Sequence, residues 1–357
     1  MSESSVLAAR GVRLPIVQGP MAGADTARLA AAVSQAGGLG MLGCGMRSPS
    51  AMREAAAEVR RLTAQPFGIN LFVQETPTPD PATVAQALER LAPLYAQWGL
   101  QPSVPARWCE DFGAQFETLL ELRPAFASFT FGILDAAQVQ RLHAVGCTVI
   151  GTATTVQEAL AWAEVGADAV CASGLEAGGH RGTFLGDFTA AQVGTLALVP
   201  QCVDALAPQG VAVIAAGGIM DGRGMAAAQA LGAQAVQMGT AFLACPESGI
   251  GPAYRTALAR ADATQTRLTR SFSGRPARGI TNAMMAQLQP LEHTWPAYPV
   301  HNALMGPVRR AAAEADDSGY LALWAGQGVA AARALPAAAL VQELVREWQA
   351  ARKQMQS

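Results

Sequence analysis

Lysine is almost absent from this sequence of 357 residues. Of its 25 basic side chains, one is a lysine, Lys353, and it lies close to the end of the chain. Enzymes that form a Schiff base with their substrate or with pyridoxal phosphate need a lysine in the active site. The sequence therefore excludes lysine-dependent aldolases and pyridoxal-phosphate enzymes.

Paired cysteines and metal-binding motifs are missing as well. The six cysteines are scattered without a CxxC pair, and several lie in apolar runs, which indicates free thiols in a reducing compartment. No HxH or HExxH motif and no cluster of histidine and aspartate occurs in the sequence. We therefore expect neither a disulfide framework nor a bound metal.

The chain also lacks a strong net charge and an uninterrupted apolar run. Its formal net charge is −2, which does not suit a nucleic-acid partner or an anionic membrane surface. The N-terminal segment has no basic region followed by an apolar one, and the apolar stretch 194–220 is interrupted by Pro200, Asp204 and Pro208. We expect a cytoplasmic protein.

What the sequence does contain is a repeating unit: an apolar strand, a glycine-rich or polar turn, and an alanine-rich helix ended by glycine. "DAAQVQRLHAVG" (135–146) begins with the N-cap candidate Asp135 and stops at Gly146, directly before a strand. Similar units end at Gly166 and Gly232. The pattern predicts an α/β fold, a (β/α)8 TIM barrel. Its strands are expected at 14–20, 39–44, 67–72, 125–131, 147–153, 167–173, 211–216 and 233–239.

Two segments do not fit this repeat. Residues 73–124 are long for one crossover, so we expect an added loop or helix over the barrel mouth. Residues 251–318 contain four prolines between 276 and 299 and look like a smaller module. We predict a barrel domain over 1–250, a substrate or lid module over 251–318, and a C-terminal helical return to the barrel over 319–357.

Glycines gather in the turns after the seventh and eighth predicted strands. "AAGGIMDGRG" and "QMGTAF" offer backbone N–H groups with little side-chain obstruction, and barrels often bind phosphate there. A single pair of glycines could simply turn the chain. Glycines after two consecutive strands favour a site for a phosphorylated ligand. The predicted phosphate cradle is Gly217, Gly218, Gly239 and Thr240.

"SGLEAGGHRGTF" (173–184) follows the sixth strand and places His180 between glycines and an arginine. Imidazole can move a proton near neutral pH or offer a directed N–H bond, so we predict a functional role for His180 over a structural one. Glu176 is expected to fix this loop or to pair with Arg181. His143, inside a predicted helix, is expected to be structural or solvent-facing.

Two other turns can face the same ligand. "PIVQGPMAG" at the first strand is a glycine-bounded turn where the backbone can approach a flat ring. Asn70 ends the third strand, where its amide suits the donor and acceptor edge of a heterocycle, although an ordinary turn residue has the same appearance.

These motifs resemble the FMN-dependent nitronate monooxygenases, formerly called 2-nitropropane dioxygenases, and specifically their bacterial class I. The matching motifs run from residue 15 to 328 and also include "SFTFG", "GTATT", "FSGRPARG" and "LWAGQG". The resemblance implies FMN lying across the C-terminal mouth of the barrel, with its phosphate in the cradle after strands seven and eight. The residues it places beside the flavin are Met21, Ala22, Asn70, Thr152, Gly178, Gly179 and Gln327.

The resemblance also implies which residues face the substrate. His180 matches the family's active-site histidine. Some members have a second histidine where this chain has Thr130, and some have a second tyrosine near Tyr298 where this chain has Asn302. We expect Thr130 and Tyr298 to lie in the substrate pocket.

The implied reaction is oxidation of an alkyl nitronate, such as propionate 3-nitronate, by O₂ to a carbonyl compound and nitrite. A nitronate is already deprotonated, so His180 would hold its oxygens, whereas with a neutral nitroalkane it would act as the base. Two alternatives stay open: an NAD(P)H-dependent FMN reductase acting on a quinone or enoyl thioester, and a flavin-binding sensor or scaffold without a reaction. The expected partners are the nitronate and O₂, and the expected state is a monomer or homodimer.

Overall fold

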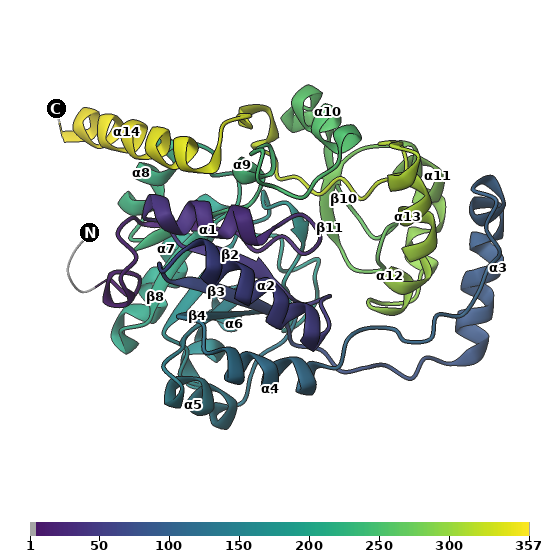
Figure 1. Ribbon diagram of the computed structural model, residues 1–357, viewed down its shortest axis with the longest axis horizontal. Coiled ribbons are helices and arrows are strands. Elements are labelled where there is room, and N and C mark those ends of the chain that lie inside the picture. The colour runs from purple at the N-terminus through teal and green to yellow at the C-terminus, as the bar shows by residue number, and fades with distance from the viewer. Residues whose placement is uncertain (1–4, 357) are drawn as a thin grey trace.

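The computed structural model describes residues 5–356, and its centre is a barrel of eight parallel strands (Figure 1). Neighbouring strands follow the order β1-β9-β8-β6-β5-β4-β3-β2. Leu39, beside β2, closes the ring: its N–H donates to Ile16 O at 2.8 Å and its carbonyl accepts from Gln18 N at 2.9 Å. The predicted (β/α)8 TIM barrel is confirmed. The strands are β1 (Ile16–Gln18), β2 (Gly40–Gly43), β3 (Phe67–Phe72), β4 (Phe126–Thr130), β5 (Thr148–Ala153), β6 (Ala169–Ser173), β8 (Ala212–Ala216) and β9 (Ala235–Met238).

Helices cover the outside of the barrel, and polar side chains cap their N-termini, as predicted for Asp135. The side chains of Asp135, Thr155 and Asp221 each accept a hydrogen bond from a backbone N–H in the first turn of the helix that follows. The helices after β1 to β8 are α1 (Ala27–Ala36), α2 (Pro49–Leu62), α4 (Phe112–Leu122), α5 (Ala136–Ala144), α6 (Val156–Glu164), α7 (Thr195–Leu206) and α8 (Gly222–Ala230).

The eighth outer position is filled from the far end of the chain. β9 is followed only by the short helix α9 (Thr240–Leu243), and α14 (Ala337–Gln356) packs against α8 and α1 (Figure 1). Leu340, Leu344 and Trp348 of α14 belong to the same buried cluster as the apolar residues of α1 and α8. The C-terminal helix therefore completes the outer layer of the barrel.

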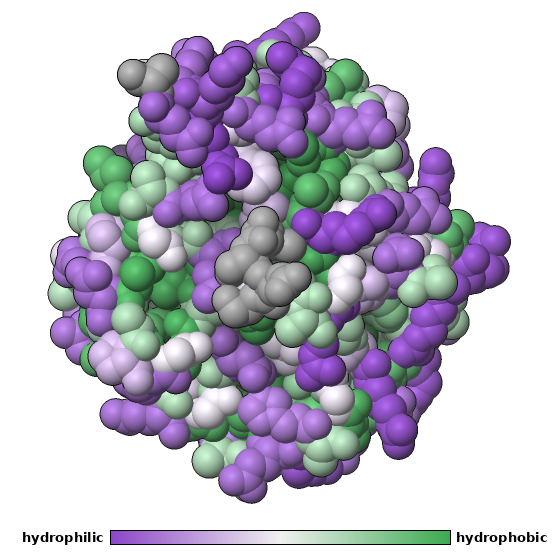
Figure 2. Space-filling view, turned by 90° about the vertical axis from the view of Figure 1, so that its left-hand side faces the viewer, coloured by the Kyte–Doolittle hydropathy of each residue, from purple (hydrophilic) through white to green (hydrophobic). Residues whose placement is uncertain are grey.

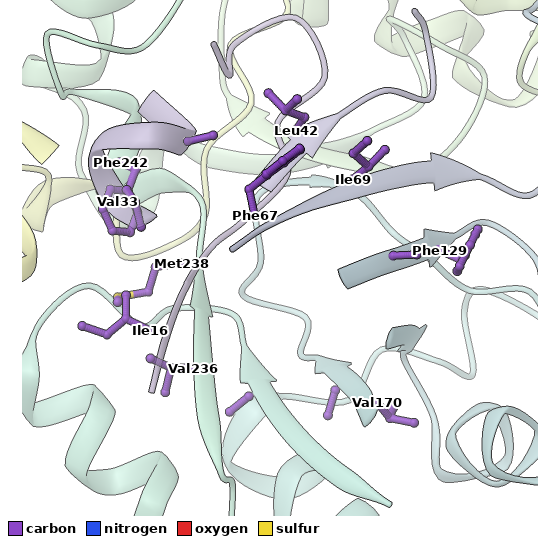
Figure 3. Close-up of a cluster of buried hydrophobic side chains, with 14 of the residues drawn as sticks. Ile16, Val33, Leu42, Phe67, Ile69, Phe129, Val170, Val236, Met238 and Phe242 are labelled. Carbon is purple, nitrogen blue, oxygen red and sulfur yellow. The ribbon is translucent and has the colours of Figure 1, made fainter. Parts of the chain in front are cut away.

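The strands are buried on both faces, as expected for a parallel sheet covered by helices. Alternate residues point outward to the helices or inward to the barrel axis: Ile16 joins the outer cluster, whereas Val17 joins the inner one. Figure 3 shows part of the outer cluster, including Ile16, Val236 and Met238 from the strands and Val33 from α1.

A second, antiparallel sheet lies at the barrel mouth. It has the order β10-β11-β7, formed by β10 (Thr266–Thr269), β11 (Ala277–Ile280) and β7 (Gly179–His180). His180 pairs with Ala277, and Gly179 pairs with Arg278. The segment interpreted from the sequence as a loop therefore contains a two-residue strand, which joins the barrel to residues beyond 250.

The remaining helices form the smaller part of the molecule, on the right of Figure 1. The long segment 73–124 contains the added helix α3 (Pro81–Gln97), whose buried face packs against α11, α12 and α13 in one apolar cluster. The Tyr95 hydroxyl of α3 donates to the carbonyl of Leu304. The other helices of the smaller part are α10 (Pro252–Arg260), α11 (Ala283–Leu288), α12 (Val300–Leu304) and α13 (Gly306–Glu314).

Short 3-10 helices occur along the whole described chain. They are η1 (Ala8–Arg10), η2 (Ala207–Gln209), η3 (Ala263–Gln265), η4 (Gln289–Thr294) and η5 (Val329–Ala331).

Hydrophilic side chains cover most of the face on the left of Figure 1, and apolar side chains there form separate small groups (Figure 2). Within residues 5–356, none of the helices combines the length and the apolar composition needed to span a bilayer.

Gly151 in β5 leaves space for Trp162 of α6. A Cβ atom at Gly151 would overlap the indole ring, which is fully buried and stacks on Phe129 at 6.3 Å between centroids. The indole Nε1–H also donates to the carbonyl of Thr152 at 3.2 Å. Gly151 therefore sets the position of the strand end that carries Thr152 to the barrel mouth.

We expect Gly151→Ala to lower the free energy of unfolding by about 1–3 kcal/mol, because the added methyl group displaces a packed indole. Urea unfolding followed by tryptophan fluorescence measures this change. The control is Gly306→Ala in α13, where the nearest heavy atom to the added Cβ is 3.9 Å away, so stability should stay equal or rise. Equal effects at both positions would contradict the overlap.

Candidate active site

A cavity of about 520 Å³ opens at the C-terminal ends of the strands, between the barrel and the smaller part of the molecule. This size is typical of small-molecule and cofactor sites. Bare backbone forms much of its wall, so a flat ring can come close to the main chain. Eleven lining residues are glycines: Gly19, Gly23, Gly178, Gly179, Gly217, Gly218, Gly239, Gly249, Gly251, Gly326 and Gly328.

Nearly all of the residues predicted for the site line this one cavity. They are Met21, Ala22, Asn70, Thr130, Thr152, Gly178, Gly179, His180, Gly217, Gly218, Gly239, Thr240 and Tyr298. Gln327 does not line it: its side chain is exposed, while its neighbours Gly326 and Gly328 line the cavity. Its backbone N–H donates to the carbonyl of Glu176 at 2.9 Å, so the segment reaches the site with its main chain.

The two glycine turns predicted to hold a phosphate lie side by side, because β8 and β9 are neighbours in the sheet. Gly217 has φ 116°, and a Cβ there would lie 2.6 Å from Thr195 Oγ1, so glycine alone fits. The Glu176 carboxylate accepts from the N–H of Thr195 at 2.9 and 3.0 Å. Glu176 therefore fixes the loop, while Arg181 instead donates to the carbonyls of Ser173 and Gly174.

A chain of polar side chains crosses the floor of the cavity from β3 to β5. Asn70 Nδ2 donates to Ser128 Oγ at 2.9 Å and to Thr130 Oγ1 at 3.3 Å, and Thr130 Oγ1 lies 3.2 Å from Thr152 Oγ1. Asn70 is thus oriented by its neighbours in the sheet, which distinguishes it from a plain turn residue. The hydroxyl groups of Thr130 and Thr152 add donors and acceptors to the cavity wall.

Asp25 positions the turn after β1, a role that no motif in the sequence indicates. Its Oδ2 accepts from the N–H groups of Met21 and Gly43, each at 2.7 Å, and its Oδ1 pairs with Arg47 at 2.8 Å. Burial raises the pKa of Asp25 to about 6, and Arg47 opposes this rise. The carboxylate therefore holds Met21 at the cavity edge.

Three hydrogen-bond contacts meet at the Ser273 hydroxyl beside His180. Its Oγ lies 2.8 Å from His180 Nε2, 3.2 Å from the carbonyl O of Arg275 and 3.3 Å from the N of Arg275. The hydroxyl has one proton, so all three are satisfied only when it donates to the carbonyl and His180 Nε2–H donates to Ser273. This pattern assigns the Nε2–H tautomer to His180.

The second ring nitrogen of His180 is an acceptor that faces the cavity. Nδ1 has no hydrogen bond to any residue in 5–356, and it is not enclosed away from the cavity that His180 lines. Rings surround the imidazole, with centroids at 5.6 Å for Phe131, 5.5 Å for Tyr298 and 5.1 Å for Trp324. The imidazole therefore has a fixed plane and one free lone pair.

Burial, helped by the nearby positive charges of Arg275 and Arg309, lowers the pKa of His180 to about 3. The imidazole is therefore neutral at pH 7. Arg275 lies 4.1 Å above the Phe131 ring and donates to the carbonyls of Arg181 and Thr183, which ties the loop to the second sheet. A neutral imidazole with a free Nδ1 can accept a proton.

The other histidines lie outside the cavity lining. His301 is fully buried and stacks on Trp295. Its Nε2–H donates to the carbonyl O of Ser271 at 2.8 Å, because a carbonyl only accepts. His143 is exposed and bonds Asp168 at 2.9 Å, as its place in the sequence predicts.

The family model described as nitronate monooxygenase matches residues 4–347. A nitronate monooxygenase from Pseudomonas aeruginosa is 46% identical over 344 residues, covering 94% of this chain and 97% of the relative. A nitroalkane oxidase structure from Streptomyces ansochromogenes is 41% identical with a TM-score of 0.91, covering 98% of this chain and 100% of that one. FabK from Thermotoga maritima is 31% identical with a TM-score of 0.76, covering 98% and 97%.

We expect His180 to remain neutral and in the Nε2–H tautomer between pH 5 and 8, because its pKa is about 3 and Ser273 accepts from Nε2. NMR of protein labelled with ¹⁵N-histidine measures both properties, and a His180→Gln sample assigns the signals. Ser273→Ala should release the tautomer preference. Protonation of His180 near its ordinary pKa of about 6.5, or an Nδ1–H tautomer, would contradict this assignment.

Proposed function

The chain belongs to the nitronate monooxygenase family of flavin-dependent oxidoreductases and oxidises nitronates, and we propose that it does so with FMN bound across the mouth of the barrel. The observation that carries this proposal is the glycine-lined cavity that ends at His180. The reaction we assign converts an alkyl nitronate, such as propionate 3-nitronate, and O₂ to a carbonyl compound and nitrite.

The lining residues fit FMN in two respects. The adjacent turns at Gly217–Gly218 and Gly239–Thr240 provide a place for one phosphate, where added side chains would obstruct the approach. Gly179 has φ 75° and no heavy atom within 4 Å of a Cβ built on it, so that a ring can rest on its backbone. When bound, FMN supplies the electron transfer between nitronate and O₂.

We propose that the barrel holds the cofactor and the smaller module holds the substrate. The barrel, 1–250, contributes the glycine turns and Asn70, whereas the module, 251–318, contributes Tyr298, Asn302 and Arg309 to the same cavity. Residues 319–357 then lead back to the barrel: Trp324 lines the cavity, and α14 packs on the outside of the barrel. Substrate preference would in this case follow changes in the module.

We propose that His180 acts as the base when the substrate is a neutral nitroalkane. Its Nδ1 lone pair faces the cavity and the imidazole is neutral, which are the two requirements for removing a proton from carbon. A nitronate has no such proton to lose. His180 is then a neighbour of the substrate, and its contribution to the rate should be smaller.

We further propose a cytoplasmic location, which is supported by the six free cysteines, five of them buried. Nitronate and O₂ are the only partners that the proposed reaction needs. A monomer or a homodimer is compatible with it.

The purified protein tests this function directly. We expect a yellow protein that releases FMN on denaturation and, with ethylnitronate in air, consumes O₂ and produces nitrite. Chromatography of the released flavin and a nitrite assay measure these outcomes. Release of FAD, or flavin reduction by NADH without turnover of any nitronate, would contradict the proposal and favour a reductase.

We expect His180→Asn to lower kcat/KM for nitroethane by about 10²–10⁴-fold, because general-base catalysis is lost. The loss with ethylnitronate should stay below about tenfold, since no proton is removed from it. Steady-state assays with both substrates at equal FMN content measure the difference. His143→Asn, at an exposed histidine, is the control and should change neither value. Equal losses with the two substrates would remove the assigned base role.

A further inference from the structure

Arg309 in α13 is the one arginine or lysine among the described residues that line the cavity. Its Nη1 donates to the carbonyl of Phe272 at 2.8 Å, and its Nη2 donates to the carbonyl of Asn302 at 2.9 Å. These bonds use two of the five guanidinium N–H groups and fix the plane of the fork. These are the hydrogen bonds that Arg309 forms within residues 5–356, and its Nε is not fully buried, so Nε–H and the second hydrogens of Nη1 and Nη2 remain for a ligand in the cavity that Arg309 lines.

The positive charge of Arg309 has no acidic partner in the part of the chain that the structure describes. Asp316 is the acidic residue of the cavity lining, but it is exposed and its Oδ1 accepts from Ala253 N at 2.8 Å. A largely desolvated guanidinium without a counter-charge is unfavourable, and an anion in the cavity would relieve this.

The charge acts at the end of the cavity where His180 lies. Arg309 contributes to the low pKa of His180, and it opposes the rise that burial causes in the pKa of Tyr298. Phe272, which Arg309 holds, directly precedes Ser273, the partner of His180. The glycine turns suited to a phosphate follow β8 and β9, whereas Arg309 is fixed to the module around His180.

A nitronate needs such a group. It is a planar anion whose two oxygens are bonded to one nitrogen, and the flat fork of arginine matches two oxygens of this kind with parallel N–H bonds. His180 cannot supply the positive charge, because it is neutral and directs a lone pair at the cavity. We propose that Arg309 is the substrate-binding residue that holds the nitronate oxygens and gives the enzyme its preference for the anion.

This inference rests on the proposed function, and ligands of similar shape but different charge test it separately. Ethylnitronate and nitroethane differ by one proton, and inorganic nitrate is an unreactive planar anion. We expect Arg309→Gln, which retains an amide donor, to weaken nitrate binding and raise KM for ethylnitronate by about 10- to 100-fold, as loss of a hydrogen bond to a charged group predicts. KM for nitroethane should change less than threefold. Calorimetry with sodium nitrate and steady-state kinetics measure these values.

Two variants control for folding and for net charge. Arg309→Lys keeps the charge and should recover most of the nitrate affinity, although it loses the planar fork. Arg310→Gln removes the same charge from the next position of α13, where the side chain is exposed, and should leave nitrate binding unchanged. Arg309→Gln with wild-type nitrate affinity and wild-type KM for ethylnitronate would overturn the inference.

A measurement on the wild-type protein covers the case in which Arg309→Gln does not fold. Crystals of the FMN-loaded enzyme soaked in sodium bromide should show anomalous density beside the open N–H groups of Arg309, and its absence there would overturn the inference. A wild-type enzyme that binds nitrate at Arg309 but turns over no nitronate would refute the proposed function alone.

Discussion

The pairing of β7 with β11 is the constraint on which the site depends. Two residues, Gly179 and His180, form an edge strand against Ala277 and Arg278, and this joins a glycine-rich turn at the barrel mouth to a sheet from the other part of the chain. Without it, the flanking glycines would leave the imidazole free to take many orientations. With it, Ser273 lies against Nε2, and the free nitrogen is directed into the cavity.

At this end of the cavity, electrostatics gives His180 and Arg309 different roles. Burial behind a wall of aromatic rings, helped by two arginines that form no ion pair within residues 5–356, holds His180 neutral, so it serves as an acceptor of protons. The same charge that suppresses protonation of the imidazole can attract an anion to the cavity. A cationic histidine would combine both roles in one group, but it could not then accept a proton.

Most of the fold could be predicted because its signals are local. Strand burial, N-cap residues such as Asp135 and glycines at helix ends lie within one unit, and they predicted all eight barrel strands. The partner of His180 could not be predicted in this way, because Ser273 lies 93 residues further along the chain and β7 is too short to give a pattern. The segment "FSGRPARG", which contains Ser273, is indicated only by the family resemblance. Arg309 lies in an ordinary amphipathic helix, where an arginine usually indicates a solvated face.

The position of α14 as the last member of the outer helical layer has a consequence for biosynthesis. All eight strands have been synthesised once residue 238 is made, yet the groove between α1 and α8 stays uncovered until residues 337–348 have been translated and released. The segment between β9 and α14 is thus attached at both ends to one hydrophobic core. A nascent chain that stalls within it exposes an apolar groove, which makes truncated products targets for chaperones and proteases.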